Sequence, residues 1–203
     1  MTGPVSGVVL AAGLSTRFEA GADKPKQLFR VGGESLVRRT CRAALASALG
    51  EVILVTGYAT GRVRSEVADL DLRTVHNPSY ADGQSGSVRC GLAAVADDAK
   101  GAMFLPIDQP GLDAAVIDRL LGAFGGPDSI VVPTFRGRRG APATFGRDWF
   151  ARLEGLRGDE GARPLLRELA ERVEELELDS ELPLVDIDTE AEARAWVERS
   201  GTP

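Results

Sequence analysis

The chain has 203 residues, 43% of them hydrophobic, with a formal net charge of −6. This size and composition predict one globular domain over residues 1–203 rather than a disordered chain. The acidic balance without a basic stripe argues against nucleic-acid binding, and no apolar run approaches the roughly 20 residues of a membrane span. No basic signal-peptide segment precedes the first apolar run, so we expect a cytoplasmic protein without a membrane partner.

In the first half of the chain, short apolar runs predict strands at 8–12, 52–56, 72–75 and 102–107. Helical periodicity predicts helices at 34–49, ended by Gly50, at 60–70, capped by Thr60, and at 87–96. Cys41 and Cys90 fall in different predicted helices without CxxC spacing. We therefore expect buried free thiols, and neither a zinc site nor a disulfide.

In the second half, a helix is predicted over 113–124, with Asp113 as its cap, followed by strands at 130–133 and 143–145. The basic turn at 136–140 separates these two strands. Helices at 148–156 and 164–172 and short strands at 174–178 and 184–187 follow. Thr189 and Glu192 have the spacing of a capping box, which predicts the start of a last helix.

Alternating strands and helices predict an α/β fold with three layers: a Rossmann-like, mostly parallel sheet with helices on both faces. The turn at 136–140, followed directly by a strand, predicts one antiparallel excursion. Ligands of such sheets bind at the carboxyl ends of the strands. Polar segments at three strand ends are therefore candidate site elements: the loop after Gly13, Asp108, and the pair Asp186 and Asp188.

The apolar run at 8–12 stops at Gly13, and a loop without helical period follows. This loop carries hydroxyl and cationic side chains, among them Ser15, Arg17 and Lys26. A strand ending in glycine before such a loop is suited to a polyanion such as a nucleoside triphosphate. It is neither a P-loop nor a GxGxxG turn. The alternative is an ordinary loop with solvated cations.

Two segments supply carboxylates at strand ends. Asp108 follows the apolar strand at 102–107, where a carboxylate can hold Mg²⁺ against substrate phosphates. The alternative for Asp108 is a turn aspartate that accepts hydrogen bonds from nearby backbone N–H groups. Asp186 and Asp188 stand two apart, so on a strand both side chains point to the same side. The alternative for this pair is a surface strand end that assists the last helix.

Two further segments are suited to substrate contacts. The polar loop at 76–89 runs into a helix N-terminus, where Gly83, Ser85 and Ser87 can read a base or bind an anion through free N–H groups. The basic turn offers Arg138 and Arg139, which can pair bidentately with a phosphate. The alternatives are a plain capped loop and a solvated hairpin tip.

The order and spacing of these motifs resemble the MobA-like NTP transferase family, whose members carry a nucleotide-diphospho-sugar-transferase-type Rossmann fold. The resemblance is closest to the molybdenum cofactor cytidylyltransferase branch, the MocA type. It rests on these segments: Leu10-Ala11-Ala12-Gly13-x-Ser15-x-Arg17, Pro25-Lys26-Gln27, Asp108-Gln109-Pro110, Gly158-Asp159-Glu160-Gly161-Ala162-Arg163 and Asp186-Ile187-Asp188-Thr189. The chain departs from the family pattern at Ala141, where histidine is usual, and this puts the acceptor in doubt.

The resemblance implies the following roles for individual residues. The catalytic set is Arg17, Lys26 and Asp108. The nucleotide-binding set is Leu10, Ala11, Ala12, Gly13, Ser15, Arg17, Lys26, Gly83, Ser85 and Ser87. The acceptor-binding set is Arg138, Arg139 and Gly140. A Mg²⁺ ion would be held by Asp108, Asp186 and Asp188.

We therefore expect an enzyme that transfers CMP from CTP to molybdopterin and releases pyrophosphate. Cytosine is favoured because the chain has a Leu-Ala-Ala-Gly loop, whereas guanylyl-transferring relatives carry Leu-Ala-Gly-Gly. One alternative is nucleotidyl transfer to another small phosphorylated metabolite. Another is a non-catalytic nucleotide-binding protein that serves molybdoenzyme maturation, with a molybdoenzyme or maturation factor as its partner.

Overall fold

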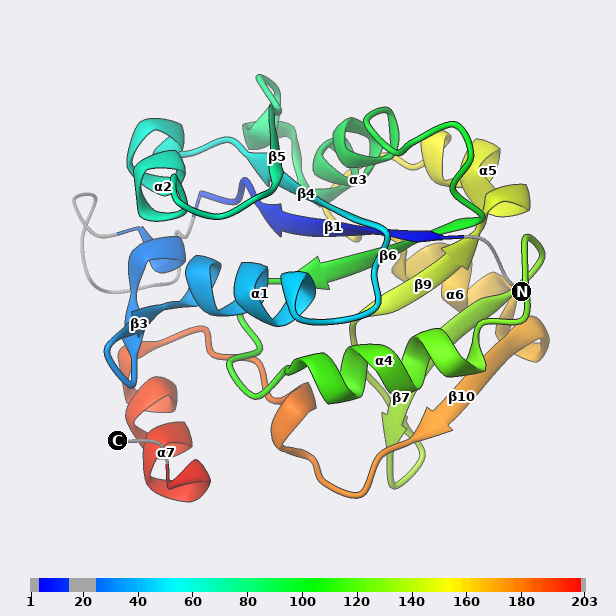
Figure 1. The fold of residues 1–203 in the computed structure, drawn as a ribbon. Helices are drawn as coiled ribbons and strands as arrows, with labels where there is room; N and C mark the ends of the chain where they lie inside the picture. The colour runs from blue at the N-terminus through cyan, green and yellow to red at the C-terminus, as the bar shows by residue number, and fades with distance from the viewer. Residues whose placement is uncertain (1–3, 15–24, 202–203) are drawn as a thin grey trace.

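The computed structural model describes residues 4–14 and 25–201, and its centre is an eight-stranded sheet (Figure 1). The strand order is β10-β7-β9-β6-β1-β4-β5, with β8 paired to β7 at one end. The strands are β1 (Val5–Ala11), β4 (Glu51–Thr56), β5 (Arg73–His76), β6 (Gly101–Pro106), β7 (Ile130–Phe135), β8 (Arg138–Arg139), β9 (Ala143–Gly146) and β10 (Val173–Glu177). A separate hairpin pairs β2 (Arg30–Val31) with β3 (Glu34–Ser35).

Most strand pairs are parallel, as expected from the alternation of strands and helices. β9 is antiparallel to both β6 and β7, which confirms the antiparallel excursion predicted after the basic turn. β6, β1, β4 and β5 run parallel to one another, so their carboxyl ends share one edge of the sheet. β7 shares the direction of β6, since both run against β9.

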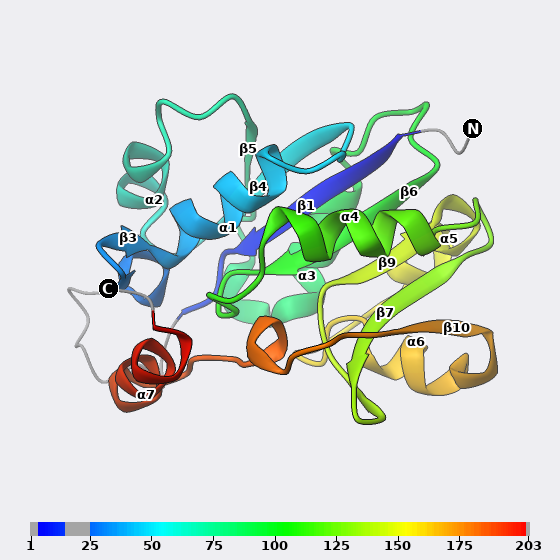
Figure 2. The same ribbon diagram turned by 60° about the horizontal axis from the view of Figure 1, so that its bottom comes forward.

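Helices cover both faces of the sheet, which confirms the three-layer α/β fold (Figures 1 and 2). One core cluster packs α1 (Leu36–Leu45), α2 (Thr60–Glu66) and α4 (Ala114–Ala123) against the sheet. The other packs α3 (Gln84–Leu92), α5 (Phe150–Glu154) and α6 (Arg163–Glu168). The last helix, α7 (Glu190–Ser200), packs beside the β2–β3 hairpin in a third cluster. Short 3₁₀ helices are η1 (Lys26–Leu28), η2 (Tyr80–Asp82), η3 (Arg147–Trp149), η4 (Ala170–Arg172) and η5 (Leu182–Leu184).

The central strand β1 is apolar on both sides because helices cover both sides. Val8 packs in the α3 cluster and Val9 in the α1 cluster, as the twofold period of a strand requires. Gly91 lets α3 approach β1 closely. A Cβ at Gly91 would lie 2.3 Å from Val8 Cγ1 and 3.0 Å from Val55 Cγ2.

Several predicted boundaries are wrong for local reasons. The helix predicted from Glu34 begins at Leu36, because Glu34 pairs with Val31 in the hairpin and Ser35 is the cap. That helix ends at Leu45, before Gly50. Thr60 is not a cap either: Ala59 is the N-cap, and the Thr60 hydroxyl donates to the Gly57 carbonyl.

Residues 184–187 do not form the predicted strand. η5 is followed by irregular backbone, and the Ile187 N–H donates to the Asp108 carbonyl at 2.8 Å. The predicted caps at Asp113 and at Thr189 with Glu192 are confirmed. Cys41 is a buried free thiol as predicted, whereas Cys90 is only half-buried. Among the described residues, no helix is long and apolar enough to cross a membrane.

Candidate active site

The ammonium group of Lys26 lies between two carboxylates at the carboxyl edge of the sheet. Its Nζ is 3.0 Å from Asp108 Oδ2 and 2.7 Å from Asp188 Oδ1. Lys26 opens η1, Asp108 lies just beyond β6, and Asp188 immediately precedes the cap of α7. Only 11% of the Lys26 side chain is exposed. Three distant parts of the sequence therefore meet around one buried cation.

The second carboxylate of the predicted pair, Asp186, is held by a residue next to Asp108. Gln109 Nε2 donates to Asp186 Oδ1 at 3.0 Å. Burial raises the pKa of Asp186, and the negative charge of Asp108 raises it further. Asp186 and Asp188 thus lie near the same cluster, although not through strand periodicity as predicted, because their segment is irregular.

These side chains fit a divalent cation in their chemistry. Carboxylate oxygens are the ligands that Mg²⁺ prefers, and it uses one or two of them together with substrate phosphates and water. Asp108 and Asp188 already converge on one positive charge within 3.0 Å. Within residues 4–14 and 25–201, however, no three carboxylate, histidine or cysteine side chains form a ready-made metal site. The Lys26 ammonium stands where the two carboxylates meet.

The loop after β1 is fixed by a glutamine from the Pro-Lys-Gln segment. Gln27 is 1% exposed, and its Nε2 donates to the carbonyls of Ala11 at 3.2 Å and Gly13 at 2.6 Å. Gly13 is exposed, and a Cβ there would meet no described atom within 4 Å. Ser15 and Arg17 lie outside the described residues.

Two N–H groups at the N-terminus of α3 already have hydrogen-bond partners within the protein. The Gln84 N–H donates to Asp159 Oδ1 at 3.1 Å, and the Ser85 N–H donates to the Gly158 carbonyl at 3.2 Å. Gly83 adopts φ 106°, and a Cβ there would lie 2.7 Å from the Gly158 oxygen. The polar loop at 76–89 and the segment Gly158-Asp159 thus pack on each other here.

The predicted base-reading hydroxyls near this helix are buried. Ser87 Oγ accepts from Asn77 Nδ2 at 3.1 Å. Ser85 is 1% exposed, and its Oγ has no hydrogen-bond partner among the described atoms. Both serines remain predicted nucleotide contacts.

A cavity of about 460 Å³ opens beside the carboxylates. It brings together the predicted metal ligands Asp108 and Asp186 and the predicted acceptor residues Arg138, Arg139 and Gly140. Its apolar lining residues are Leu10, Val88, Phe104, Pro106, Phe135, Ala141, Ala143, Ala162, Leu166 and Leu184. Its remaining polar and charged lining residues are Gln84, Gln109, Glu160, Arg163, Arg167 and Glu181. The lining of the cavity therefore combines apolar side chains with charged ones.

The two arginines of the basic turn differ in how they are held. The Arg138 side chain is 83% exposed, and its one described ion pair, to Glu181, is 3.4 Å long. Arg139 donates from Nε to Glu175 at 2.7 Å, and its other nitrogens donate to the carbonyls of Leu166 and Ala170. Arg139 therefore joins the turn to the end of α6, whereas Arg138 is the more accessible cation.

The sequence reasoning assigned no role to Gln27, Gln109 and Asn77, all of which are buried and bonded at the site. Gln27 stands in the Pro25-Lys26-Gln27 segment, and Gln109 stands in the Asp108-Gln109-Pro110 segment. Their position directly beside Lys26 and Asp108 was the available signal. Arg163 and Arg167 of the cavity wall were also missed as ligand contacts, because they look like exposed helical cations.

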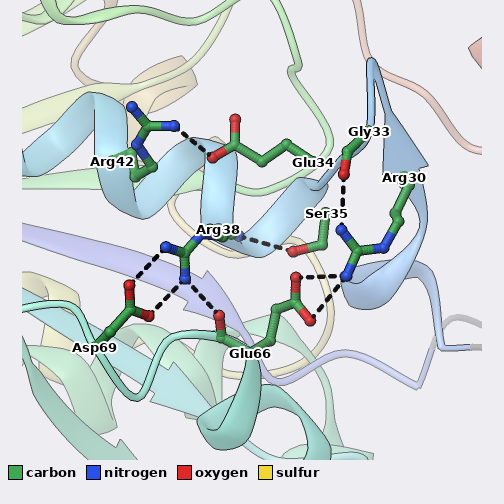
Figure 3. A network of polar contacts seen from close by, with 8 residues as sticks. All are labelled: Arg30, Gly33, Glu34, Ser35, Arg38, Arg42, Glu66 and Asp69. Carbon is green, nitrogen blue, oxygen red and sulfur yellow. Dashed lines mark hydrogen bonds and ion pairs between the residues drawn. The ribbon is translucent and has the colours of Figure 1, made fainter.

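A polar network supports the segment that carries Lys26 (Figure 3). Arg30 of the hairpin pairs with Glu66 of α2 at 3.1 Å, and Arg38 of α1 donates to the Glu66 carbonyl at 2.9 Å. Arg38 also forms two 2.7 Å hydrogen bonds with the Asp69 carboxylate, which lowers the pKa of Asp69 to about 2. The hairpin after η1 is thereby tied to two helices.

The chain resembles known proteins in sequence. The family model of the MobA-like NTP transferase domain matches residues 7–173. Purine catabolism protein PucB of Bacillus subtilis is 32% identical over 79% of this chain and 80% of its own length. Nicotine blue oxidoreductase of Paenarthrobacter nicotinovorans is 30% identical over 91% of this chain and 92% of its own. The match to the bifunctional protein GlmU of Kineococcus radiotolerans, in contrast, spans 27% of that protein.

Solved structures agree with the fold. Rv0371c from Mycobacterium tuberculosis H37Rv superposes with a TM-score of 0.84 at 30% identity, over 98% of this chain and 100% of that one. A complex of Rv0371c with manganese gives a TM-score of 0.81 at 31% identity, over 96% and 98% of the two chains.

Proposed function

Because the chain belongs to the MobA-like NTP transferase family, we propose that it transfers CMP from CTP to the molybdopterin cofactor and releases pyrophosphate. Its family supports a nucleotidyltransferase that acts on a nucleoside triphosphate and a phosphorylated substrate. The observation that carries the proposal is the meeting of Lys26 with Asp108 and Asp188 beside the cavity. We further propose a single domain over residues 1–203, acting in the cytoplasm with a molybdoenzyme or its maturation factor as partner.

The proposed reaction needs positioning and charge neutralisation rather than a covalent intermediate. An oxygen of the acceptor phosphate bonds to the α-phosphorus of CTP, while the bond from that phosphorus to the bridging oxygen breaks and pyrophosphate leaves. Lys26 would neutralise the triphosphate, and Arg17 is proposed from the sequence to do the same. Asp108, Asp186 and Asp188 would hold Mg²⁺, which adds positive charge beside the transferring phosphoryl group when bound.

The cavity supports a small acceptor with a ring and a phosphate. Its volume, about 460 Å³, falls in the roughly 300–1,000 Å³ range of small-molecule sites. Phe104 and Leu10 offer an apolar floor, and Arg138 at the rim can pair with a phosphate. Ala141 lines this cavity in place of the usual histidine, which leaves more room for the acceptor at that wall.

Two other functions give different outcomes in one assay. The first is nucleotidyl transfer to another phosphorylated metabolite. The second is a nucleotide-binding accessory protein without catalysis, which would not need the Lys26 cluster. Pyrophosphate release should be measured with CTP, UTP, ATP and GTP, each with Mg²⁺ or a chelator, and with or without molybdopterin. We expect release only with CTP, Mg²⁺ and molybdopterin together. Release with a different acceptor would support the first alternative.

Asp108→Asn separates catalysis from nucleotide binding. Asparagine keeps the shape and a hydrogen-bond acceptor but lacks the negative charge that a hard cation requires. We expect the rate to fall on the order of a hundredfold or more, since the metal contributes several kcal/mol to the transition state. CTP binding should persist. Asp97→Asn, at an exposed aspartate outside the cavity lining, is the matched control. Full activity of a folded Asp108→Asn protein would contradict metal-assisted transfer.

A further inference from the structure

Lys26 lies between Asp108 and Asp188, two of the carboxylates proposed to bind the divalent cation. Its Nζ lies 3.0 Å from Asp108 and 2.7 Å from Asp188, both within hydrogen-bond distance. The Lys26 side chain is 11% exposed, whereas Asp108 is 29% and Asp188 46% exposed, so water screens the contact with Asp188 more than the contact with Asp108. A divalent cation and the ammonium group therefore compete for the same oxygens.

Lys26 is held in this position by its own segment. Pro25 precedes it, and the Pro25 carbonyl accepts from the Leu28 N–H at 2.9 Å. The next side chain, Gln27, is anchored on the carbonyls of Ala11 and Gly13. The backbone on both sides of Lys26 is thus fixed, while its long side chain keeps rotatable bonds that allow Nζ to move.

We infer that Lys26 is the internal counter-ion of the metal-binding carboxylates, and that it keeps divalent-cation affinity low until a triphosphate draws the ammonium away. The polyphosphate offers Lys26 new anionic partners, and Asp108 and Asp188 are then released for the cation. The cation and the nucleotide would accordingly bind together rather than the cation first. This inference rests on the metal ligands of the proposed function, but it concerns the nucleotide-free protein.

Lys26→Met tests the inference without any nucleotide. Methionine has a similar length and no charge, so the variant removes the ammonium group from between the two carboxylates. Mn²⁺ binding to the nucleotide-free protein can be followed by the loss of the free-ion paramagnetic resonance signal. We expect Lys26→Met to bind Mn²⁺ at least about tenfold more tightly than the wild type, given two lost charge-assisted hydrogen bonds. Lys26→Arg keeps the charge and should bind as weakly as the wild type.

Two controls identify the source of any change. Lys100→Met removes a charge from an exposed lysine and should leave Mn²⁺ affinity unchanged. The double variant Lys26→Met with Asp108→Asn should lose the gain. Equal Mn²⁺ affinity of wild type and Lys26→Met would overturn the counter-ion role while leaving the metal site standing. Absence of Mn²⁺ binding in both would overturn the metal ligands as well.

Folding gives an independent readout. Lys26→Met removes the ion pairs of the ammonium group with Asp108 and Asp188, so it should melt at a lower temperature than the wild type. Millimolar Mg²⁺ should restore more of the melting temperature in Lys26→Met than it adds to the wild type. If Lys26→Met is recovered only unfolded, Mg²⁺ during refolding should raise its yield, and failure of Mg²⁺ to do so would contradict the inference.

Discussion

Gln109 donates a hydrogen bond of 3.0 Å from Nε2 to the carboxylate of Asp186, a residue 77 positions later in the chain. Gln109 is 3% exposed, and its Oε1 has no hydrogen-bond partner among the described atoms. One half of the amide therefore orients a carboxylate, and the other half is a buried oxygen without a partner among the described atoms. Gln109 is a positioning residue in this arrangement.

Replacing Gln109 with alanine should lower kcat with little change in nucleotide affinity. The lost hydrogen bond is to a charged group, worth about 1.5–3 kcal/mol, or roughly ten- to a hundredfold in rate if Asp186 must be held in place. Gln109→Glu keeps the shape but replaces the donor with a negative charge, so it should be at least as slow. Steady-state kinetics and nucleotide titration check this. An unchanged kcat in both folded variants would remove Gln109 from the site.

Arg138→Ala and Arg139→Ala should have different effects. Arg138 is mostly exposed at the cavity, so its loss should raise the KM for the acceptor roughly tenfold and leave the melting temperature unchanged. Arg139 joins the basic turn to α6 and η4 through two carbonyls and to β10 through Glu175, so its loss should lower the melting temperature as well. Kinetics and thermal unfolding of both variants decide this. The idea fails if Arg138→Ala destabilises the protein as much as Arg139→Ala does.

Asp69 should contribute a pH-dependent part of the stability. The hydrogen bond from Arg38 lowers the pKa of Asp69 from its ordinary value of 3.8 to about 2. A carboxylate whose pKa is lowered on folding stabilises the folded state above its unfolded pKa, and the effect disappears as the pH falls through the folded pKa. Asp69→Asn should therefore be less stable than the wild type above about pH 4, and the difference should vanish near pH 2.

Urea unfolding of both proteins across this pH range checks the prediction. Since the Asp69 side chain is 65% exposed, added salt should reduce the difference. A gap between the two proteins that does not change with pH would show that Asp69 acts through packing instead.

Two glycines should respond to alanine with opposite signs. Gly91 lies where α3 meets β1, and a Cβ there would be 2.3 Å from Val8 Cγ1, so Gly91→Ala should cost about 1–3 kcal/mol. Gly122 is exposed on α4, with no described atom within 4 Å of an added Cβ. Gly122→Ala should stabilise by roughly 0.4–1 kcal/mol. Free energies of unfolding from denaturant titrations check both signs, and a stabilising Gly91→Ala would contradict the close packing.

The sheet could be predicted from the sequence because buried parallel strands are apolar runs, as at Val8 and Val9. Lys26 and Asp108 are singled out in the sequence because their segments resemble family motifs in the same order, and the structure places the two side chains 3.0 Å apart. The strand predicted at 184–187 is wrong: three of these four residues are apolar, yet the Ile187 N–H donates to the Asp108 carbonyl rather than to a neighbouring strand.

The N-terminus of α3 shows why local patterns fall short. Gly83, Ser85 and Ser87 have the composition of an open anion site. The N–H of Gln84 instead donates to Asp159, 75 residues later, and the N–H of Ser85 donates to the Gly158 carbonyl. Such a contact depends on how the helices pack over the sheet, and the local sequence pattern does not indicate it.

The ion pair of Lys26 with Asp188 also has a consequence for how the protein is made. The two residues are 162 positions apart, and Asp188 lies in the irregular segment that returns across the sheet edge to Asp108. At about 5–20 residues per second, a ribosome needs on the order of ten to thirty seconds to add the second partner after the first. During that interval a nascent chain can assemble β1, β4 and β6 while Lys26 and Asp108 are already in place. The cluster is therefore completed only once Asp188 has been added, and a nascent chain that has not yet reached Asp186 can hold neither of the last two carboxylates.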